Sequence, residues 1–225
     1  MALNVEQARF NMIEQQIRTW EVLDERVLET LKAVPREEFV PSKYRRMAFM
    51  DVRIPLGHGQ VMLKPVEEGR LLQALNLSPG QTVLEVGTGY GFLSACLAHL
   101  GGQVMSLEIV PQFVEAAQAR LNNAKVKDVS VVEGDALDDA FLDSGVLGGG
   151  EFDCVVITSS AASVPAGLMR HAAVGGRVVA IRGHSPAMEA VCLHRHGAQQ
   201  WQTESLFETD VPRLMGAEDV EQFEF

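Results

Sequence analysis

The segment LEVGTGYGF holds three glycines at alternating positions, Gly87, Gly89 and Gly91, at the end of an apolar run. Glycine leaves out the side chain where a backbone must turn sharply and approach a bound molecule. In open α/β sheets, ligands bind beyond the carboxyl ends of the strands at turns of this kind. The spacing therefore predicts a ligand-binding loop. Glu85 stands at the base of this loop, where its carboxylate could orient the loop or bind a ligand ammonium group through water.

Two further carboxylates end the next two apolar runs. Glu108 follows QVMSL about 20 residues after the glycines, where a carboxylate typically binds both hydroxyls of a ribose. Asp135 in EGDA ends the following run, where it can accept a hydrogen bond from an adenine amino group while Ala136 keeps the backbone close. Acids at the ends of three consecutive predicted strands indicate a nucleoside-type cofactor.

A dinucleotide and S-adenosylmethionine are the two alternatives for this cofactor. The dinucleotide-binding turn has the spacing G-x-G-x-x-G, but Phe92 stands where its third glycine would be, and the spacing here is G-x-G-x-G. This departure favours S-adenosylmethionine. A nicotinamide-dependent oxidoreductase is the weaker hypothesis, because no hydride-transfer site can be identified in the sequence.

The elements that position these residues follow from hydrophobic periodicity. VEQARFNMIEQQIR and DERVLETLKAV space apolar residues at three and four and predict two helices. Asp24 is the expected N-cap of the second helix, which ends before Pro35. A third helix begins at Pro65 and continues through VEEGRLLQALNL.

Short apolar strands alternate with helices after this third helix. The predicted strands are TVLEV, QVMSLEI, VSVVEGD, FDCVVIT, GGRVVAIRG, MEAVCLHRH and WQTESLFE. Strands separated by helices pair in parallel, whereas the short connection between the last two predicts a terminal antiparallel hairpin. We therefore expect a doubly wound, mostly parallel seven-stranded α/β sheet of the Rossmann-like class. Residues 1–64 form a helical amino-terminal segment with a substrate loop, and residues 65–225 form the cofactor-binding domain, together one compact unit.

Composition excludes several classes of partner. The net charge of −11 leaves no basic patch for a phosphate backbone, so no nucleic-acid partner is expected. No apolar run reaches bilayer length, and Glu6, Arg9 and Glu14 interrupt the amino terminus, so we expect a cytoplasmic protein without a membrane segment. The cysteines are widely spaced, and His194 and His196 have no acidic or cysteine partner nearby, so no metal site is expected.

The chain resembles the protein-L-isoaspartate (D-aspartate) O-methyltransferase family over most of residues 11–185. The segments that carry the resemblance, in order, are MIEQQIR, VPREEFVP, IPLGHGQ, LEVGTGYGFLSA, SLEIVP, VEGDA and FDCVVIT. The resemblance implies a class I methyltransferase that uses S-adenosylmethionine and releases S-adenosylhomocysteine. It further implies that the methionine end of the cofactor is lined by Gly87, Thr88, Gly89, Tyr90 and Gly91, the ribose by Glu108 and Ile109, and the adenine by Asp135 and Ala136.

The loop RIPLGHGQVMLKP, residues 53–65, departs from the family where the acceptor binds. The family typically has G-Q-T-I-S-x-P, in which two hydroxyls hold the isoaspartyl carboxylate, but Val61 and Leu63 stand at these positions here. A carboxylate is already ionised near neutral pH, so its methylation needs hydrogen-bond donors rather than a base. Burying it against two apolar side chains costs several kcal/mol. We expect Gln60, Val61 and Leu63 to cover the cofactor, with a pocket no longer shaped for isoaspartate.

The acceptor therefore has several candidates. The chain is an isoaspartyl methyltransferase, a methyltransferase for a small molecule such as a phenol, amine or enol, or a silent protein that binds the cofactor and acts through protein contacts. A small acceptor needs a base, for which His58 and His184 are the candidates, although a loop histidine is more often a solvated or capping residue. Thr158, Ser159 and Ser160 are expected to satisfy backbone groups in a turn, or else to bind substrate.

The carboxyl-terminal segment FETDVPRLMGAEDVEQFEF, residues 207–225, also has two interpretations. The family resemblance suggests that it passes the cofactor cleft. Its acidic composition is equally typical of a frayed tail.

Overall fold

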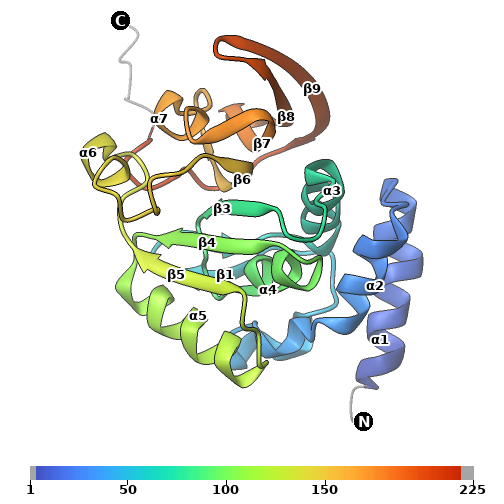
Figure 1. Cartoon of the computed structure of the whole chain (residues 1–225). Helices are drawn as coiled ribbons and strands as arrows, with labels where there is room; N and C mark the ends of the chain where they lie inside the picture. Colours follow the sequence, from blue (N-terminus) through green and yellow to red (C-terminus); the bar gives the residue numbers. More distant parts are fainter. Residues whose placement is uncertain (1–3, 219–225) are drawn as a thin grey trace, which may run out of the picture.

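A seven-stranded sheet forms the centre of the molecule, in a computed structural model that describes residues 4–218 (Figure 1). The strand order is β5-β4-β3-β6-β7-β8-β9. The strands are β3 (Thr82–Val86), β4 (Gln103–Glu108), β5 (Val129–Glu133), β6 (Phe152–Ala161), β7 (Ala172–His184), β8 (Ala187–Gly197) and β9 (Gln200–Thr209). The first five strands in this order, β5-β4-β3-β6-β7, pair in parallel. Strand β8 pairs antiparallel with both β7 and β9. The predicted fold class and the terminal hairpin are confirmed.

Helices cover both faces of the sheet because its strands carry apolar side chains on both sides. Val83 belongs to one cluster of buried side chains and its neighbour Leu84 to the other, as the two-residue period of a strand requires. Helices α3 (Pro65–Leu75), α4 (Phe92–His99) and α5 (Pro111–Asn123) contribute to the first cluster. The short helices α6 (Asp139–Leu142) and α7 (Ala166–Met169) contribute to the second.

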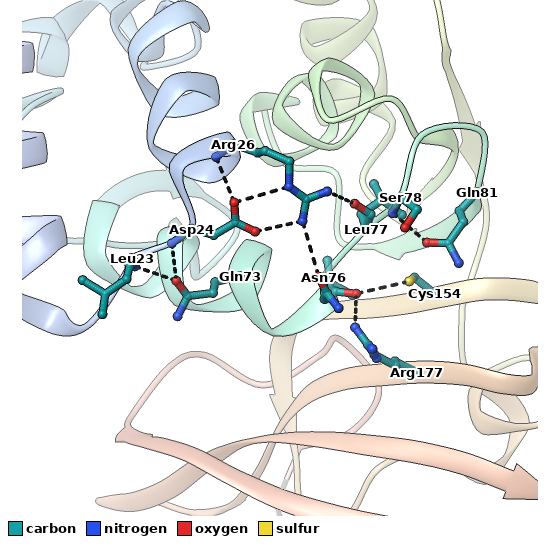
Figure 2. Close-up of polar contacts among 11 residues, drawn as sticks. Leu23, Asp24, Arg26, Gln73, Asn76, Leu77, Ser78, Gln81, Cys154 and Arg177 are labelled. Atoms are coloured by element: carbon teal, nitrogen blue, oxygen red, sulfur yellow. Dashed lines mark hydrogen bonds and ion pairs between the residues drawn. The ribbon is translucent and has the colours of Figure 1, made fainter.

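The amino-terminal segment consists of α1 (Val5–Met12) with its continuations η1 (Ile13–Ile17) and η2 (Arg18–Trp20), then α2 (Glu25–Ala33), η3 (Arg36–Glu38) and η4 (Ser42–Met47). Its first helices lie at the right of Figure 1, where η1 and α2 pack against α3 and α2 also contacts α4. Asp24 caps α2 as predicted, since its carboxylate accepts from the Arg26 backbone N–H at 2.8 Å. Gln73 Oε1 accepts from the N–H groups of Leu23 and Asp24, and Arg26 donates to the Leu77 carbonyl, which joins α2 to the end of α3 (Figure 2).

The predicted substrate loop is a β-hairpin of β1 (Ile54–Gly57) and β2 (Gln60–Met62). The two residues of its turn, His58 and Gly59, both have positive φ, 51° and 72°. Two-residue turns with this backbone match the twist of the flanking strands. Helix α3 begins at Pro65, as predicted.

The segment after β9 runs beside the end of β6. The Ser160 N–H donates to the Pro212 carbonyl at 2.9 Å, and the Leu214 N–H donates to the Ser160 carbonyl at 2.7 Å. The segment therefore returns to the carboxyl end of β6. Residues 219–225 of the predicted tail lie outside the described residues. Within residues 4–218, no helix has the length and apolar character that crossing a bilayer requires.

Candidate cofactor and acceptor site

Two adjoining hollows lie at the carboxyl ends of β3 to β6. The strand-end pocket spans about 530 Å³, open solvent included, and is lined by residues that include Gly87, Glu108, Ile109, Asp135, Ala136, Leu214 and Met215. The loop pocket spans about 380 Å³, open solvent included, and is lined by residues that include Val61, Leu63, Glu68, Thr88, Tyr90 and Phe92. Both pockets are bordered by Leu56, Val61, Gly87, Gly89 and Thr158, so they meet over the glycine turn.

The glycine turn needs glycine for steric reasons. Gly87 has φ 91°, and a Cβ there would collide with Thr158 Oγ1. Gly89 has φ 54°, and a Cβ there would stand 3.0 Å from Leu56 Cδ1 of the hairpin. The backbone of this turn is therefore closely covered by β6 on one side and the hairpin on the other, as expected for a loop that approaches a ligand.

Glu108 lies between the glycine turn and the strand-end pocket. Its Oε2 accepts from the Gly89 N–H at 2.8 Å, and its Oε1 accepts from the Val110 N–H at 3.0 Å. Burial raises the pKa of Glu108, and these two hydrogen bonds work against the rise. Ile109, 36% exposed, stands beside it in the same pocket. Each carboxylate oxygen keeps a lone pair for a ligand hydroxyl.

Asp135 follows β5 and lines the same pocket together with Ala136. Its Oδ1 accepts from the Leu137 N–H at 2.8 Å, which fixes the carboxylate in the turn between β5 and α6. The structure therefore brings together the predicted ribose and adenine residues, which are separated along the chain, in one hollow.

Glu85 lies beneath the glycine turn and lines neither pocket. It is fully buried, and its Oε2 accepts from the hydroxyls of Ser94 and Ser106. The Ser106 hydroxyl in turn bonds Thr88 at 2.5 Å, within the turn. Burial raises the pKa of Glu85 to about 7. Of its two predicted roles, this geometry favours orienting the loop.

The hairpin covers the glycine turn from outside. Gln60 Nε2 donates to the Arg213 carbonyl at 3.0 Å, and Ser159 donates weakly to Gln60 Oε1 at 3.4 Å. Val61 borders both pockets, and Leu63 is buried in the wall of the loop pocket. Gln60 therefore joins the hairpin to the carboxyl-terminal segment, and the two residues that replace hydroxyls present hydrocarbon to the pockets.

The candidate bases lie away from the loop pocket. His58 is exposed at the hairpin turn, with its ring edge-on to Phe113, which lines the strand-end pocket, at 5.5 Å between centroids. His184 lies 3.3 Å from an Arg213 guanidinium nitrogen. Among the described residues, neither imidazole lines either pocket.

The hydroxyls at the end of β6 mostly satisfy backbone groups, as predicted, although they stand in a strand rather than a turn. Thr158 Oγ1 donates to the carbonyls of Val86 and Gly87 at 3.1 and 2.9 Å. Ser160 Oγ donates to the Val211 carbonyl at 3.0 Å. Among the described residues, no three His, Cys, Asp or Glu side chains are grouped so that they could hold a metal ion.

Sequence reasoning missed Glu68, which forms part of the wall of the loop pocket. Its side chain is buried and pairs with the equally buried Arg36. A signal was available, because Glu68 shares one helical face with the buried Leu71, Leu72 and Leu75 at spacings of three, four and seven. An acid on an apolar face is rare unless it is paired or functional.

Comparisons with known proteins agree with this geometry. The family model described as protein-L-isoaspartate(D-aspartate) O-methyltransferase matches residues 7–207. A protein-L-isoaspartate O-methyltransferase of Aeropyrum pernix is 38% identical over 177 residues, which are 77% of this chain and 66% of that one. A second, from Pelobacter propionicus, is 33% identical over 219 residues, 96% of this chain and 93% of its own. A Plasmodium falciparum structure of this description, in complex with S-adenosyl-L-homocysteine, shares the fold with a TM-score of 0.77, 18% identity and coverage of 95% and 99%.

Proposed function

The chain belongs to the protein-L-isoaspartate (D-aspartate) O-methyltransferase family, and from this membership we propose that it transfers methyl groups from S-adenosylmethionine, leaving S-adenosylhomocysteine. The observation that carries the proposal is the strand-end pocket, where the glycine turn, Glu108 and Asp135 line one hollow. These residues come from the ends of three neighbouring strands, the position at which open α/β sheets bind nucleosides.

The pocket residues suit this cofactor. Because a side chain at Gly87 would meet Thr158, the turn presents its backbone to a ligand rather than a side chain. Glu108 and Asp135 offer acceptor oxygens for ribose hydroxyls and an adenine amino group. S-adenosylmethionine, when bound, supplies an electrophilic methyl group on a positively charged sulfur. The tasks of the protein are then to place an acceptor in line with that methyl group and to exclude water.

For the acceptor, we favour a molecule other than an isoaspartyl carboxylate. Val61 and Leu63 present no donor to the pockets, and the hydroxyls of Thr88 and Thr158 are already bonded within the protein. A carboxylate buried there would lose its hydration without replacement. An isoaspartyl peptide, the acceptor in the names of the relatives, is the second candidate, and sequence identity of 33% over nearly the whole chain favours it.

Calorimetry with S-adenosylmethionine and S-adenosylhomocysteine tests the cofactor. We expect micromolar binding, and Asp135→Ala or Glu108→Ala should weaken it by about 1–3 kcal/mol, the value of a hydrogen bond to a charged group. Binding of a nicotinamide dinucleotide instead would refute the proposal.

Transfer of labelled methyl groups then identifies the acceptor class. Isoaspartyl peptide and a small-molecule extract are compared in parallel reactions. Label in small molecules alone supports the favoured acceptor, and efficient labelling of the peptide supports the second candidate. Cofactor binding without labelling of either would indicate a silent protein.

A further inference from the structure

The loop pocket contains one carboxylate in an otherwise largely apolar wall. Glu68 is 3% exposed and stands in the first turn of α3, and its Oε2 accepts from Arg36 Nη1. Its Oε1 accepts no hydrogen bond from the residues that the structure describes. The wall around it is formed mainly by Leu56, Val61, Met62, Leu63, Phe92 and Leu93. This oxygen keeps its lone pairs to accept a hydrogen bond from a ligand O–H or N–H group.

Arg36 pairs with Glu68 through Oε2, and its other donors are used elsewhere. Its Nε donates to the Ala48 carbonyl at 2.8 Å and its Nη2 to the Leu63 carbonyl at 2.7 Å, and its guanidinium lies over the Phe92 ring at 4.8 Å. Arg36 is 1% exposed and does not line the pocket. Its role is to hold Glu68 and the end of the hairpin in place.

The two threonine hydroxyls of the pocket are already engaged. Thr88 Oγ1 bonds Ser106 Oγ, and Thr158 Oγ1 donates to two backbone carbonyls. The pocket therefore offers a hydrogen-bond acceptor at Glu68, beside the hydroxyl of Tyr90. It fits a ligand that donates a hydrogen bond, and it repels a second carboxylate once Glu68 is ionised.

The loop pocket also reaches the glycine turn, since Gly87, Thr88, Gly89 and Tyr90 border it. We propose that the acceptor is an uncharged aromatic molecule with a phenolic hydroxyl, bound in this pocket, and that Glu68 is the base that takes its proton. This inference rests on the methyl transfer proposed above. Phe92 and Tyr90 provide aromatic surface for a ring, and Val61 and Leu63 provide hydrocarbon.

The phenolic oxygen forms a bond to the methyl carbon, the carbon–sulfur bond breaks with its electron pair left on sulfur, and the O–H proton moves to the Glu68 carboxylate. Water then removes this proton. Burial raises the pKa of Glu68 to about 8 even with Arg36 beside it, so Glu68 is an ionised base at mildly alkaline pH. This value lies nearer to the pKa of about 10 for a phenol, which favours the transfer.

Binding provides a test that does not depend on turnover. The affinities of 4-propylphenol and of its methyl ether are measured by calorimetry with S-adenosylhomocysteine present. The wild type should bind the phenol about tenfold or more tightly than the ether, because only the phenol donates to Glu68. Glu68→Leu should abolish this preference, and it should leave binding of the ether nearly unchanged.

Rates of methyl transfer provide the second test, with 4-propylphenol compared with 4-nitrophenol, which is largely ionised at mildly alkaline pH. Glu68→Gln should slow methylation of 4-propylphenol by about 100-fold or more and that of the ionised nitrophenol far less, since only the former needs a base. Glu67→Gln is the matched control. Glu67 is buried next in sequence and pairs with Arg53, but it does not line the loop pocket. This control should slow both phenols equally.

Several outcomes would overturn the inference. If Glu68→Gln mainly weakens S-adenosylmethionine binding, then Glu68 holds the cofactor ammonium group instead of the acceptor. If it slows both phenols equally, as Glu67→Gln does, then its role is structural. If the wild type binds the cofactor but neither binds nor methylates 4-propylphenol, the acceptor class is wrong and the methyltransferase assignment stands. Failure to bind the cofactor at all would instead refute the proposed function itself.

Discussion

Replacing Glu85 with glutamine should make the free energy of unfolding rise, relative to wild type, as the pH increases. Glu85 is fully buried beneath the glycine turn, and burial raises its pKa from the ordinary value of 4.5 to about 7. An acid with a raised pKa binds its proton more tightly in the folded state. Its contribution to stability is therefore fully present below about pH 4.5 and is lost as the pH rises through about 7.

The magnitude follows from the two pKa values. A difference of about 2.5 pKa units corresponds to about 3 kcal/mol of unfolding free energy lost by the wild type between about pH 4.5 and pH 8. Glutamine does not ionise, and its amide oxygen can accept from the hydroxyls of Ser94 and Ser106. The difference in unfolding free energy between Glu85→Gln and wild type should therefore rise by about 3 kcal/mol over this range. Any effect of the amide N–H₂ group is independent of pH and does not change this rise.

Urea unfolding of both proteins at a series of pH values measures this difference. Ser94→Ala is a matched variant with the opposite expected effect. Because the Ser94 hydroxyl lowers the pKa of Glu85, its removal should increase the unfolding free energy that is lost at high pH. Glu108 also raises the pKa of Glu85, so the comparison is made without ligand at Glu108. A difference between Glu85→Gln and wild type that stays constant with pH would refute the reasoning.

Two further predictions concern the walls of the pockets. Val61→Thr with Leu63→Ser should raise isoaspartyl methylation by about two orders of magnitude, since two donors to a charged oxygen are restored. Adding Glu68→Gln should raise it again above about pH 8, where the mutation removes a like charge. A wild type already as active as the double mutant would contradict this. Ending the chain after Asp210 removes the buried Leu214 from the strand-end pocket, so cofactor binding should weaken about tenfold and thermal stability should fall, whereas a chain ending after Glu218 should match the full chain in calorimetry. Equal losses in both truncations would contradict this role.

Much of the site was predictable because its signals are local. The glycine turn is encoded by residues that must adopt positive φ within a few positions of one another, and Gly87 and Gly89 do so. Glu108 and Asp135 were predictable because each ends an apolar strand, and parallel strands place such ends on one edge. The Asp24 cap and the start of α3 at Pro65 depend only on neighbouring residues.

Long-range packing decided the rest. The sequence offered His58 as a base, but the hairpin turn places it against Phe113, beside the strand-end pocket. Glu85 precedes the turn by two residues, yet the alternation of β3 directs its side chain into the core rather than toward a ligand. Glu68 enters the site only because α3 packs behind the hairpin and Arg36, 32 residues away in sequence, holds its carboxylate there. Local patterns determine which residues turn, cap and end strands, whereas contacts between distant segments determine which side chains face the same cavity.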